Sequence, residues 1–215
     1  MPVATKNRGI IRKGEENMLK LRKGCKVPFP ERLSEGYEHM DFGIVANVGA
    51  DKIRSVLEHF IAIWDEKIFF ILELPSALKD EVEIRPGVLA AKHKDVYYID
   101  GCTAEKALTI LAKTADLLIN DGMSTFGFGC HESKDEILIG YYNVVSIYTS
   151  NKERYDGFFE AHEINQVETL LTAWDTFSQE TPGESEIVVT DGKRVYDIPE
   201  MFKDWGIYFA ERREE

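Results

Sequence analysis

The spacing of apolar residues changes from one period to another along the first half of the chain, and this restricts the folds open to it. Over residues 42–48, apolar side chains recur at every second position, as expected of a strand with one buried face. Residues 51–64 then carry apolar side chains at helical spacing. The run at residues 68–72 is continuously apolar and short enough for a strand buried on both faces. We therefore predict a strand–helix–strand unit over residues 42–74.

A second unit of the same kind follows. Residues 96–99 have the composition of a strand, and the Asp-Gly pair at residues 100–101 is a turn signal. Thr103 can cap the helix that the apolar stripe of residues 104–119 predicts. A hairpin is predicted over residues 126–149, and we expect its second strand to run unbroken from residue 136 to the end.

Three further elements are predicted beyond residue 160. Asn165 and Glu168 have the spacing of a capping box, ahead of a helix that continues to residue 177. The Asp-Gly pair at residues 191–192 is a strong turn signal and predicts a hairpin over residues 187–196. Residues 198–213 predict a final helix, because a proline stands in its first turn.

These elements predict an α+β protein with a mixed or mainly antiparallel sheet, built from strand–helix–strand units and hairpins, with helices packed on it. We interpret residues 1–40 as a basic N-terminal arm and irregular lead-in, with at most one short helix around residues 15–22. Residues 41–215 contain no linker rich in Pro, Gly or Ser, so we expect a single α+β domain. Residues 76–83 are an ambiguous short helix, and an internal duplication of the two units stays open.

Charge is segregated along the chain. Residues 1–26 hold eight Lys and Arg against two Glu, a net charge of +6, whereas the whole chain carries −12. Residues 27–215 therefore carry −18, the difference between the two. Such a body repels the phosphates of nucleic acid and favours a protein partner with a basic surface. The plainer alternative is that the acidic residues only keep the protein soluble. The basic arm, for its part, can fold across the acidic body of its own chain or of a second copy in a homodimer.

Cysteine usage and hydropathy bear on the compartment. The three cysteines are widely spaced and form no CxxC pair, which favours a reducing environment over a disulfide framework. No apolar run reaches the length of a membrane span, and the basic start lacks the apolar core of a secretory signal. We therefore expect a soluble, cytoplasmic protein with no membrane association.

The densest polar cluster follows the first strand of the 126–149 hairpin. His131 shares a strand face with Gly127 and Gly129, and glycine in a strand often marks the close approach of a ligand. The favoured explanation is that these glycines make room for a large side chain packed across the sheet.

Asn143 interrupts an apolar strand face, and a buried amide needs hydrogen-bond partners. If a pocket exists here, we expect it to be lined by His131, Glu132, Tyr141 and Asn143.

Familiar catalytic and metal-binding patterns do not occur in the sequence. Cys130 and His131 are adjacent in a strand and so point to opposite faces, which argues against a joint metal or nucleophile site. Residues 160–163 have one of the two histidines that a zinc-protease helix needs, and no GxGxxG, EF-hand or GxSxG pattern is found. Trp64 and Trp174 lie on apolar helical stripes and are predicted core residues. We therefore predict no catalytic residue, no metal ligand and no cofactor.

Three functions follow, in order of preference. The first is a non-enzymatic, acidic protein-interaction protein, for example an immunity- or inhibitor-type binder of a basic protein. The second is an enzyme or small-ligand-binding domain whose site, near the 126–143 hairpin, is assembled by the fold. The third is a nucleic-acid-associated protein acting through the basic arm, which the acidic body makes the least favoured.

Overall fold

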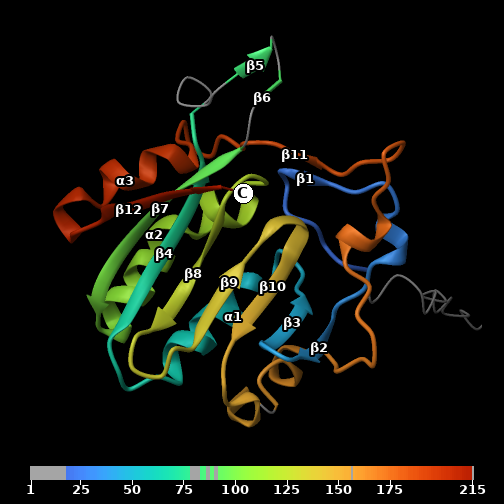
Figure 1. Cartoon of the computed structure of the whole chain (residues 1–215). Coiled ribbons are helices and arrows are strands. Elements are labelled where there is room, and N and C mark those ends of the chain that lie inside the picture. Colours follow the sequence, from blue (N-terminus) through green and yellow to red (C-terminus); the bar gives the residue numbers. More distant parts are fainter. Residues whose placement is uncertain (1–17, 78–82, 86–87, 90–91, 156, 215) are drawn as a thin grey trace, which may run out of the picture.

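A computed structural model of the chain describes residues 18–77, 83–85, 88–89, 92–155 and 157–214. Within these residues the main feature is an eight-stranded antiparallel sheet of strand order β12-β7-β4-β8-β9-β10-β3-β2 (Figure 1). The predicted α+β class is therefore confirmed. The strands of this sheet are β2 (Gly36–Met40), β3 (Gly43–Asn47), β4 (Ile68–Pro75), β7 (His93–Cys102), β8 (Thr125–Cys130), β9 (Glu136–Ile139), β10 (Val144–Tyr148) and β12 (Tyr208–Glu214).

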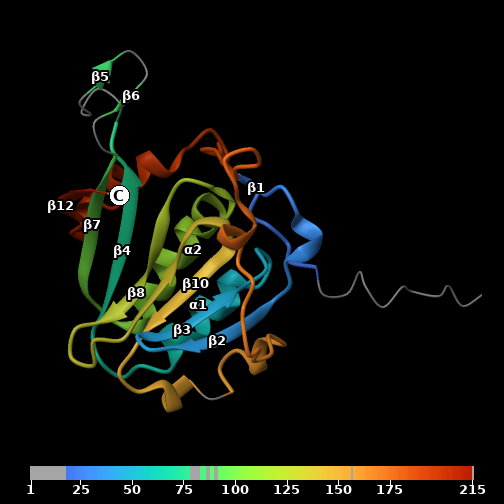
Figure 2. The ribbon, with the colours of Figure 1, turned by 45° about the vertical axis from the view of Figure 1, so that its right-hand side comes forward.

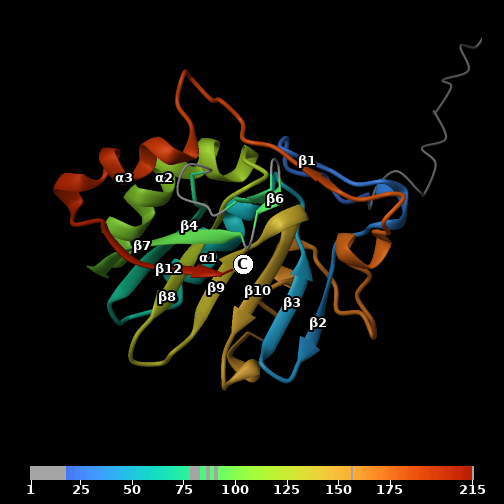
Figure 3. The same ribbon diagram turned by 45° about the horizontal axis from the view of Figure 1, so that its top comes forward.

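Smaller elements surround the sheet. Two short antiparallel pairs are β1 (Cys25–Lys26) with β11 (Glu184–Ser185) and β5 (Glu83–Arg85) with β6 (Val88–Leu89). The first pair lies beyond one end of the sheet (Figure 3). The α-helices are α1 (Ile53–Ala62), α2 (Ala104–Asn120) and α3 (Ile198–Met201). Short 3-10 helices are η1 (Pro30–Arg32), η3 (Tyr141–Asn143), η4 (Lys152–Tyr155), η5 (Glu160–His162), η6 (Ala173–Thr176), η7 (Val195–Asp197) and η8 (Lys203–Trp205).

Helices α1 and α2 pack on one face of the sheet and enclose the main core (Figure 2). Both lie close to their predicted positions, and the Thr103 hydroxyl caps α2 by accepting the N–H of Lys106 at 3.2 Å. The core contains large side chains that are almost fully buried, including Phe60, Phe70 and Phe128. Burial of each such ring contributes about 1.5–3 kcal/mol relative to exposure, so this layer stabilises the fold more than any surface pair.

The glycines of β8 have the structural role that the sequence favours. A Cβ atom on Gly129 would collide with the ring of Phe69, which crosses from the neighbouring strand β4. A Cβ atom on Gly127 would collide with the backbone carbonyl of Ile137 in β9. The prediction that these glycines make room for a large side chain is therefore confirmed at Gly129, where that side chain is Phe69.

The second strand of the 126–149 hairpin is broken, contrary to the prediction. β9 ends at residue 139 and β10 begins at residue 144. Between them, Tyr142 and Asn143 have φ values of +54° and +67°, and these left-handed residues turn the chain so that β10 pairs with both β9 and β3. The buried apolar residues on the two sides of the turn are an even number of positions apart. Their alternation therefore looks continuous in the sequence.

The predicted helix over residues 166–177 is wrong. Its first part lies along the edge strand β2, where the N–H of Val167 donates to the carbonyl of Tyr37 at 2.9 Å. The N–H of Leu170 donates instead to the carboxylate of Glu38 at 2.7 Å. These backbone donors are therefore unavailable to a helix, and only the single turn η6 forms. Trp174, predicted to be core, is 52% exposed.

The predicted helix over residues 198–213 is also wrong beyond its first turns. Gly206 has a φ of +84° and ends the helical part, a conformation that glycine adopts at little cost. The chain then forms β12, which pairs with β7 as an edge of the sheet. The hydrogen bonds to β7 stabilise the strand, and because they depend on tertiary structure, the helical spacing of the sequence does not reveal them.

Some other local predictions are wrong, and two of them extend into residues that the structure does not describe. Residues 100–101 do not turn the chain but continue β7, with Gly101 at a φ of +63°. At residues 191–192 a turn forms, flanked by a single bridge rather than two strands. The lead-in contains strand β2, and residues 18–22 are not helical; residues 15–17 and 78–82 lie outside the described residues.

Candidate functional site

A hollow of about 690 Å³ opens at the end of the sheet where β4 begins and β8 ends. We call it the acidic pocket. It is lined by Trp64, Asp65, Glu66, Lys67, Thr103, Ala104 and Glu132.

Three chain connections place these side chains. Residues 64–67 lie between α1 and β4, residues 103–104 are the cap and first residue of α2, and Glu132 lies in the turn between β8 and β9. The Glu66 carboxylate accepts the backbone N–H of Glu132 at 3.0 Å, which links the first connection to the third. The acidic pocket is thus assembled from segments that are far apart in the sequence.

Its charge is unbalanced, because three carboxylates and one ammonium, that of Lys67, line it. Within the described part of the chain, the carboxylates of Asp65 and Glu132 make no hydrogen bond or ion pair. Both residues are exposed. An ammonium or guanidinium group placed between them would gain about 1 kcal/mol per exposed pair, and more once a partner surface excludes water.

Trp64 forms the inner wall of the acidic pocket and is 6% exposed. The guanidinium carbon of Arg154 lies 3.9 Å from the centre of its ring. Its indole N–H is buried and has no hydrogen-bond partner among the residues that the structure describes. A buried donor without a partner costs about 1–3 kcal/mol, so this N–H lowers the stability of the fold locally.

His131 lies next to the acidic pocket, on the rim of a smaller hollow of about 200 Å³. Its Nε2 is 2.8 Å from Asp100, and its ring centre is 4.6 Å from that of Phe69. The Tyr208 hydroxyl donates to the other oxygen of Asp100 at 2.6 Å. Burial opposes ionisation of Asp100, but the hydrogen bonds from Tyr208 and His131 outweigh it and lower the pKa of the carboxyl. Asp100 therefore holds the imidazole in position.

Cys130 borders the same smaller hollow but is almost completely buried. Its side chain is 1% exposed, and burial raises the pKa of the thiol to about 12, so the thiol is protonated at neutral pH. Across the described ranges, no group of three or more His, Cys, Asp and Glu side chains is arranged to hold a metal ion.

The four predicted site residues fall into two places. His131 and Glu132 lie together at one end of β9, in the turn that joins it to β8. Tyr141 and Asn143 lie at the other end, in the turn that joins β9 to β10. The expected single pocket is therefore not formed, and only Glu132 lines the acidic pocket.

Asn143 is fully buried and serves the structure. Its Oδ1 accepts the backbone N–H of Arg22 at 2.9 Å, and its Nδ2 donates to the carbonyls of Lys20 and Val48 at 3.0 and 2.8 Å. Two of these three bonds attach residues 20–22 to the sheet, and the third is made to the chain just after β3.

Sequence reasoning did not find the other residues of the acidic pocket. Trp64 was correctly predicted to be a core residue, but that prediction gave no reason to expect it to line a pocket as well. Asp65 and Glu66 follow directly after the apolar stripe of α1, where acidic residues normally signal only the end of a helix. No local signal connects them to Glu132, because the contact depends on the pairing of β4 with β8.

Comparison with known proteins found no family model, no curated protein and no solved structure that matches this chain. None of the helices in the described residues is long and apolar enough to span a membrane.

Proposed function

We propose that this chain is a protein-interaction protein that binds a basic partner and receives a cationic side chain of that partner in the acidic pocket. The observation that carries the proposal is the pair of carboxylates, Asp65 and Glu132, that border a hollow of about 690 Å³ without a partner of their own in the described residues. The net charge of −12 supports it, since complementary charge speeds the association of two proteins.

The neighbouring residues suit a long cationic side chain. The guanidinium of Arg154 already occupies a cation–π position on Trp64, so a partner arginine or lysine would be bound by the carboxylates that line the pocket rather than by this ring. Glu66 is held by its bond to the backbone of Glu132, which keeps the rim in place before a partner arrives. A site that is ordered in advance loses less entropy on binding.

The test compares two doubly substituted proteins in affinity capture from the source lysate at low and high salt. The pocket variant is Asp65→Asn with Glu132→Gln. The matched control is Asp204→Asn with Glu180→Gln, which removes the same charge from two exposed positions outside the acidic pocket. We expect wild type and control to retain the same basic protein at low salt, and the pocket variant to bind it about tenfold more weakly, equivalent to ~1.4 kcal/mol. Equal weakening of both variants would remove the acidic pocket from the proposal, and no salt-sensitive basic partner at all would remove the function.

A further inference from the structure

A second hollow, of about 290 Å³, lies at the opposite end of β9 from the acidic pocket. We call it the aromatic pocket. It is lined by Lys92, Met123, Tyr141, Tyr142, Trp174, Gly183 and Ser185. Three of these side chains carry large rings, and one is a lysine. This composition differs from that of the acidic pocket and indicates a different ligand.

In the aromatic pocket, the ring of Trp174 is perpendicular to both tyrosine rings. The ring of Trp174 is 6.2 Å from that of Tyr141 at 90° and 5.0 Å from that of Tyr142 at 87°. At these distances the rings contact one another, edge against face, and leave no space for a cation enclosed between three ring faces. Trp174 is nevertheless 52% exposed. Part of the indole surface is therefore available for a ligand that stacks on it from outside.

Trp174 is held firmly despite its exposure. It belongs to the turn η6, where the carboxylate of Asp175 accepts both the N–H and the hydroxyl of Thr172 at 2.8 and 2.7 Å. Ala173 on one side of it is fully buried, and Thr176 donates to the carbonyl of Ala173 at 2.6 Å. These bonds hold the backbone of the turn, and the ring contacts to Tyr141, Tyr142 and Phe177 restrict the indole itself. A restricted ring loses less entropy when a ligand stacks on it.

The tyrosine wall is held by an unusual backbone. Tyr142 and Asn143 are consecutive non-glycine residues with positive φ, a conformation that costs energy and persists only when surrounding contacts enforce it. Here the three side-chain hydrogen bonds of buried Asn143 and the packing of Tyr142 against Phe177 at 4.9 Å enforce it. Phe177 in turn lies directly on Gly183, where any Cβ atom would collide with its ring.

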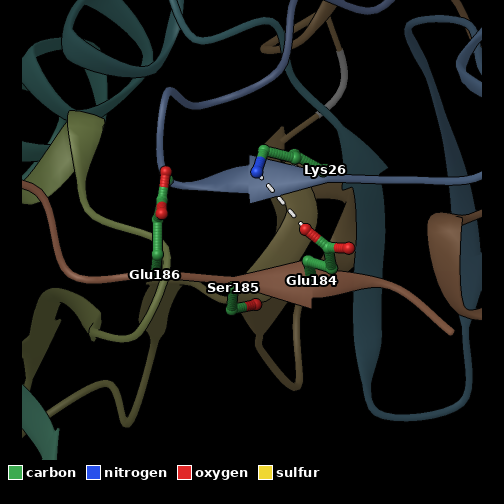
Figure 4. A pocket seen from close by; sticks show the side chains of 5 residues that line it. Lys26, Glu184, Ser185 and Glu186 are labelled. Carbon is green, nitrogen blue, oxygen red and sulfur yellow. Dashed lines mark hydrogen bonds and ion pairs between the residues drawn. The ribbon is translucent and has the colours of Figure 1, made fainter.

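Among the described residues that line the aromatic pocket, the one charged side chain, that of Lys92, is positive and favours an anionic group in the ligand. Lys92 is exposed, whereas the Lys94 ammonium, 4.8 Å from the ring of Tyr141, is already paired with the carboxylate of Glu73 at 3.8 Å. Ser185 also borders the adjoining hollow of about 330 Å³ over β1 and β11. There Lys26 and Glu184 reach toward each other across the two strands in an exposed ion pair of 3.3 Å (Figure 4). Both of these charges are thus engaged, and Lys92 is the cation that a ligand would meet.

We propose that the aromatic pocket binds a nucleotide, whose planar base stacks on Trp174 while its phosphate is held by Lys92. Aromatic side chains stack with every base, because each base has a π-face, and a lysine provides a point charge for phosphate. The volume is at the small end for a ligand site, which suits a mononucleotide rather than a larger cofactor. This inference is independent of the acidic pocket.

The experiment is calorimetric titration of the full chain with 5′-AMP, with adenosine and with ribose 5-phosphate, accompanied by tryptophan fluorescence. We expect saturable binding of 5′-AMP with quenching of the tryptophan signal, weaker binding of adenosine and no binding of ribose 5-phosphate. Trp174→Ala should weaken 5′-AMP binding at least about tenfold. Phe209→Ala, which removes a ring of the same 52% exposure outside this pocket, should leave it unchanged. Lys92→Gln should reduce the affinity for 5′-AMP to that for adenosine.

Three results would overturn the proposal. They are the absence of saturation by 5′-AMP, equal effects of Trp174→Ala and Phe209→Ala, and an affinity for 5′-AMP that Lys92→Gln leaves unchanged. A melting curve of each variant confirms that it is folded. A short oligoadenylate serves as a further arm: tighter binding than 5′-AMP assigns the site to nucleotides within a single strand, and equal or weaker binding assigns it to free nucleotide.

Discussion

At the scale of single residues, Asn143 shows why a polar residue can interrupt an apolar pattern. Its backbone takes a left-handed conformation that asparagine tolerates better than most residues. Its side chain satisfies the backbone N–H of Arg22 and the carbonyls of Lys20 and Val48, which belong to two segments far apart in the sequence. The sequence indicated that a buried amide here needs partners, but the partners are distant in sequence and could not be named.

We predict that Asn143→Ala destabilises the protein by about 2–4 kcal/mol, because buried backbone groups lose their partners and alanine is strained at positive φ. Chemical denaturation with an unchanged m-value is the measurement. Asn143→Gly relieves the strain but restores no hydrogen bond, so its stability should lie between those of wild type and Asn143→Ala. If Asn143→Gly were as stable as wild type, the hydrogen bonds would contribute nothing.

Gly127 illustrates a steric requirement at the same scale. We predict that Gly127→Ala destabilises the protein by at least about 1–3 kcal/mol, since the added methyl group meets the backbone of β9 rather than a movable side chain. Gly140→Ala is the comparison, because a Cβ atom there would lie 3.3 Å from its nearest neighbour, the carbonyl oxygen of Val144. Thermal melting of both variants measures the difference, and equal melting temperatures would contradict the expected clash.

At the scale of elements, α1 is tied to the 3-10 turn η5 by two histidines. The Nδ1 of His59 lies 3.1 Å from the Nε2 of His162, whose Nδ1 lies 3.3 Å from the hydroxyl of Ser55. A hydrogen bond between two imidazoles needs at least one of them neutral. Burial lowers the pKa of both histidines, and for His162 the nearby His59 and Lys52 lower it further.

The sign of the resulting pH dependence follows from these shifts. A base whose pKa is lowered on folding contributes stability that is fully present above its unfolded pKa, near 6.5, and is lost as the pH falls below that value. We predict that the melting temperature of wild type falls more steeply between pH 7.5 and pH 5, taken as roughly the range of histidine titration, than that of His162→Gln. His39→Gln, at an exposed histidine, is the control and should follow wild type. Parallel curves for wild type and His162→Gln would exclude the coupling.

Element prediction succeeded where local chemistry agrees with the tertiary environment. Local pattern and tertiary burial favour the same element in three places, namely the apolar stripes of α1 and α2, the Thr103 cap and the apolar run of β4. It failed at residues 166–177 and 198–213, where capping residues and helical spacing are present but the backbone bonds to β2 or to β7. Such segments pair with the edge strands of a sheet because the unpaired backbone N–H and C=O groups of an edge strand then gain hydrogen-bond partners.

At the scale of the whole molecule, the basic N-terminal segment is attached to the acidic body by a buried residue. Arg22 is 1% exposed, and its guanidinium donates to the carbonyls of Gly140 and Leu118 at 2.7 and 2.8 Å. Burial lowers its pKa, which the nearby charge of Asp121 partly offsets. The ion pairs that Lys20 and Lys26 make with the body are exposed and so contribute little.

We predict that Lys20→Gln with Lys26→Gln changes the free energy of unfolding by less than about 1 kcal/mol. Arg22→Ala, in contrast, should cost about 3 kcal/mol or more, because it leaves several buried carbonyls without donors. Urea unfolding at low and at moderate salt measures both. A large, salt-dependent loss in the double lysine variant would show instead that net charge attaches the segment.

The local sequence of this protein determined the type and order of β3, α1, β4, β7, α2, β8 and β9, because hydrophobic period, capping residues and turn residues act over a few positions. It also determined the charge asymmetry and the need for glycine in β8. Only the tertiary structure decided that β12 closes one edge of the sheet, that Glu132 joins Asp65 and Glu66, and that Tyr141 joins Trp174. Those arrangements depend on pairing between distant strands, whose free energy is a sum over contacts that no local window contains.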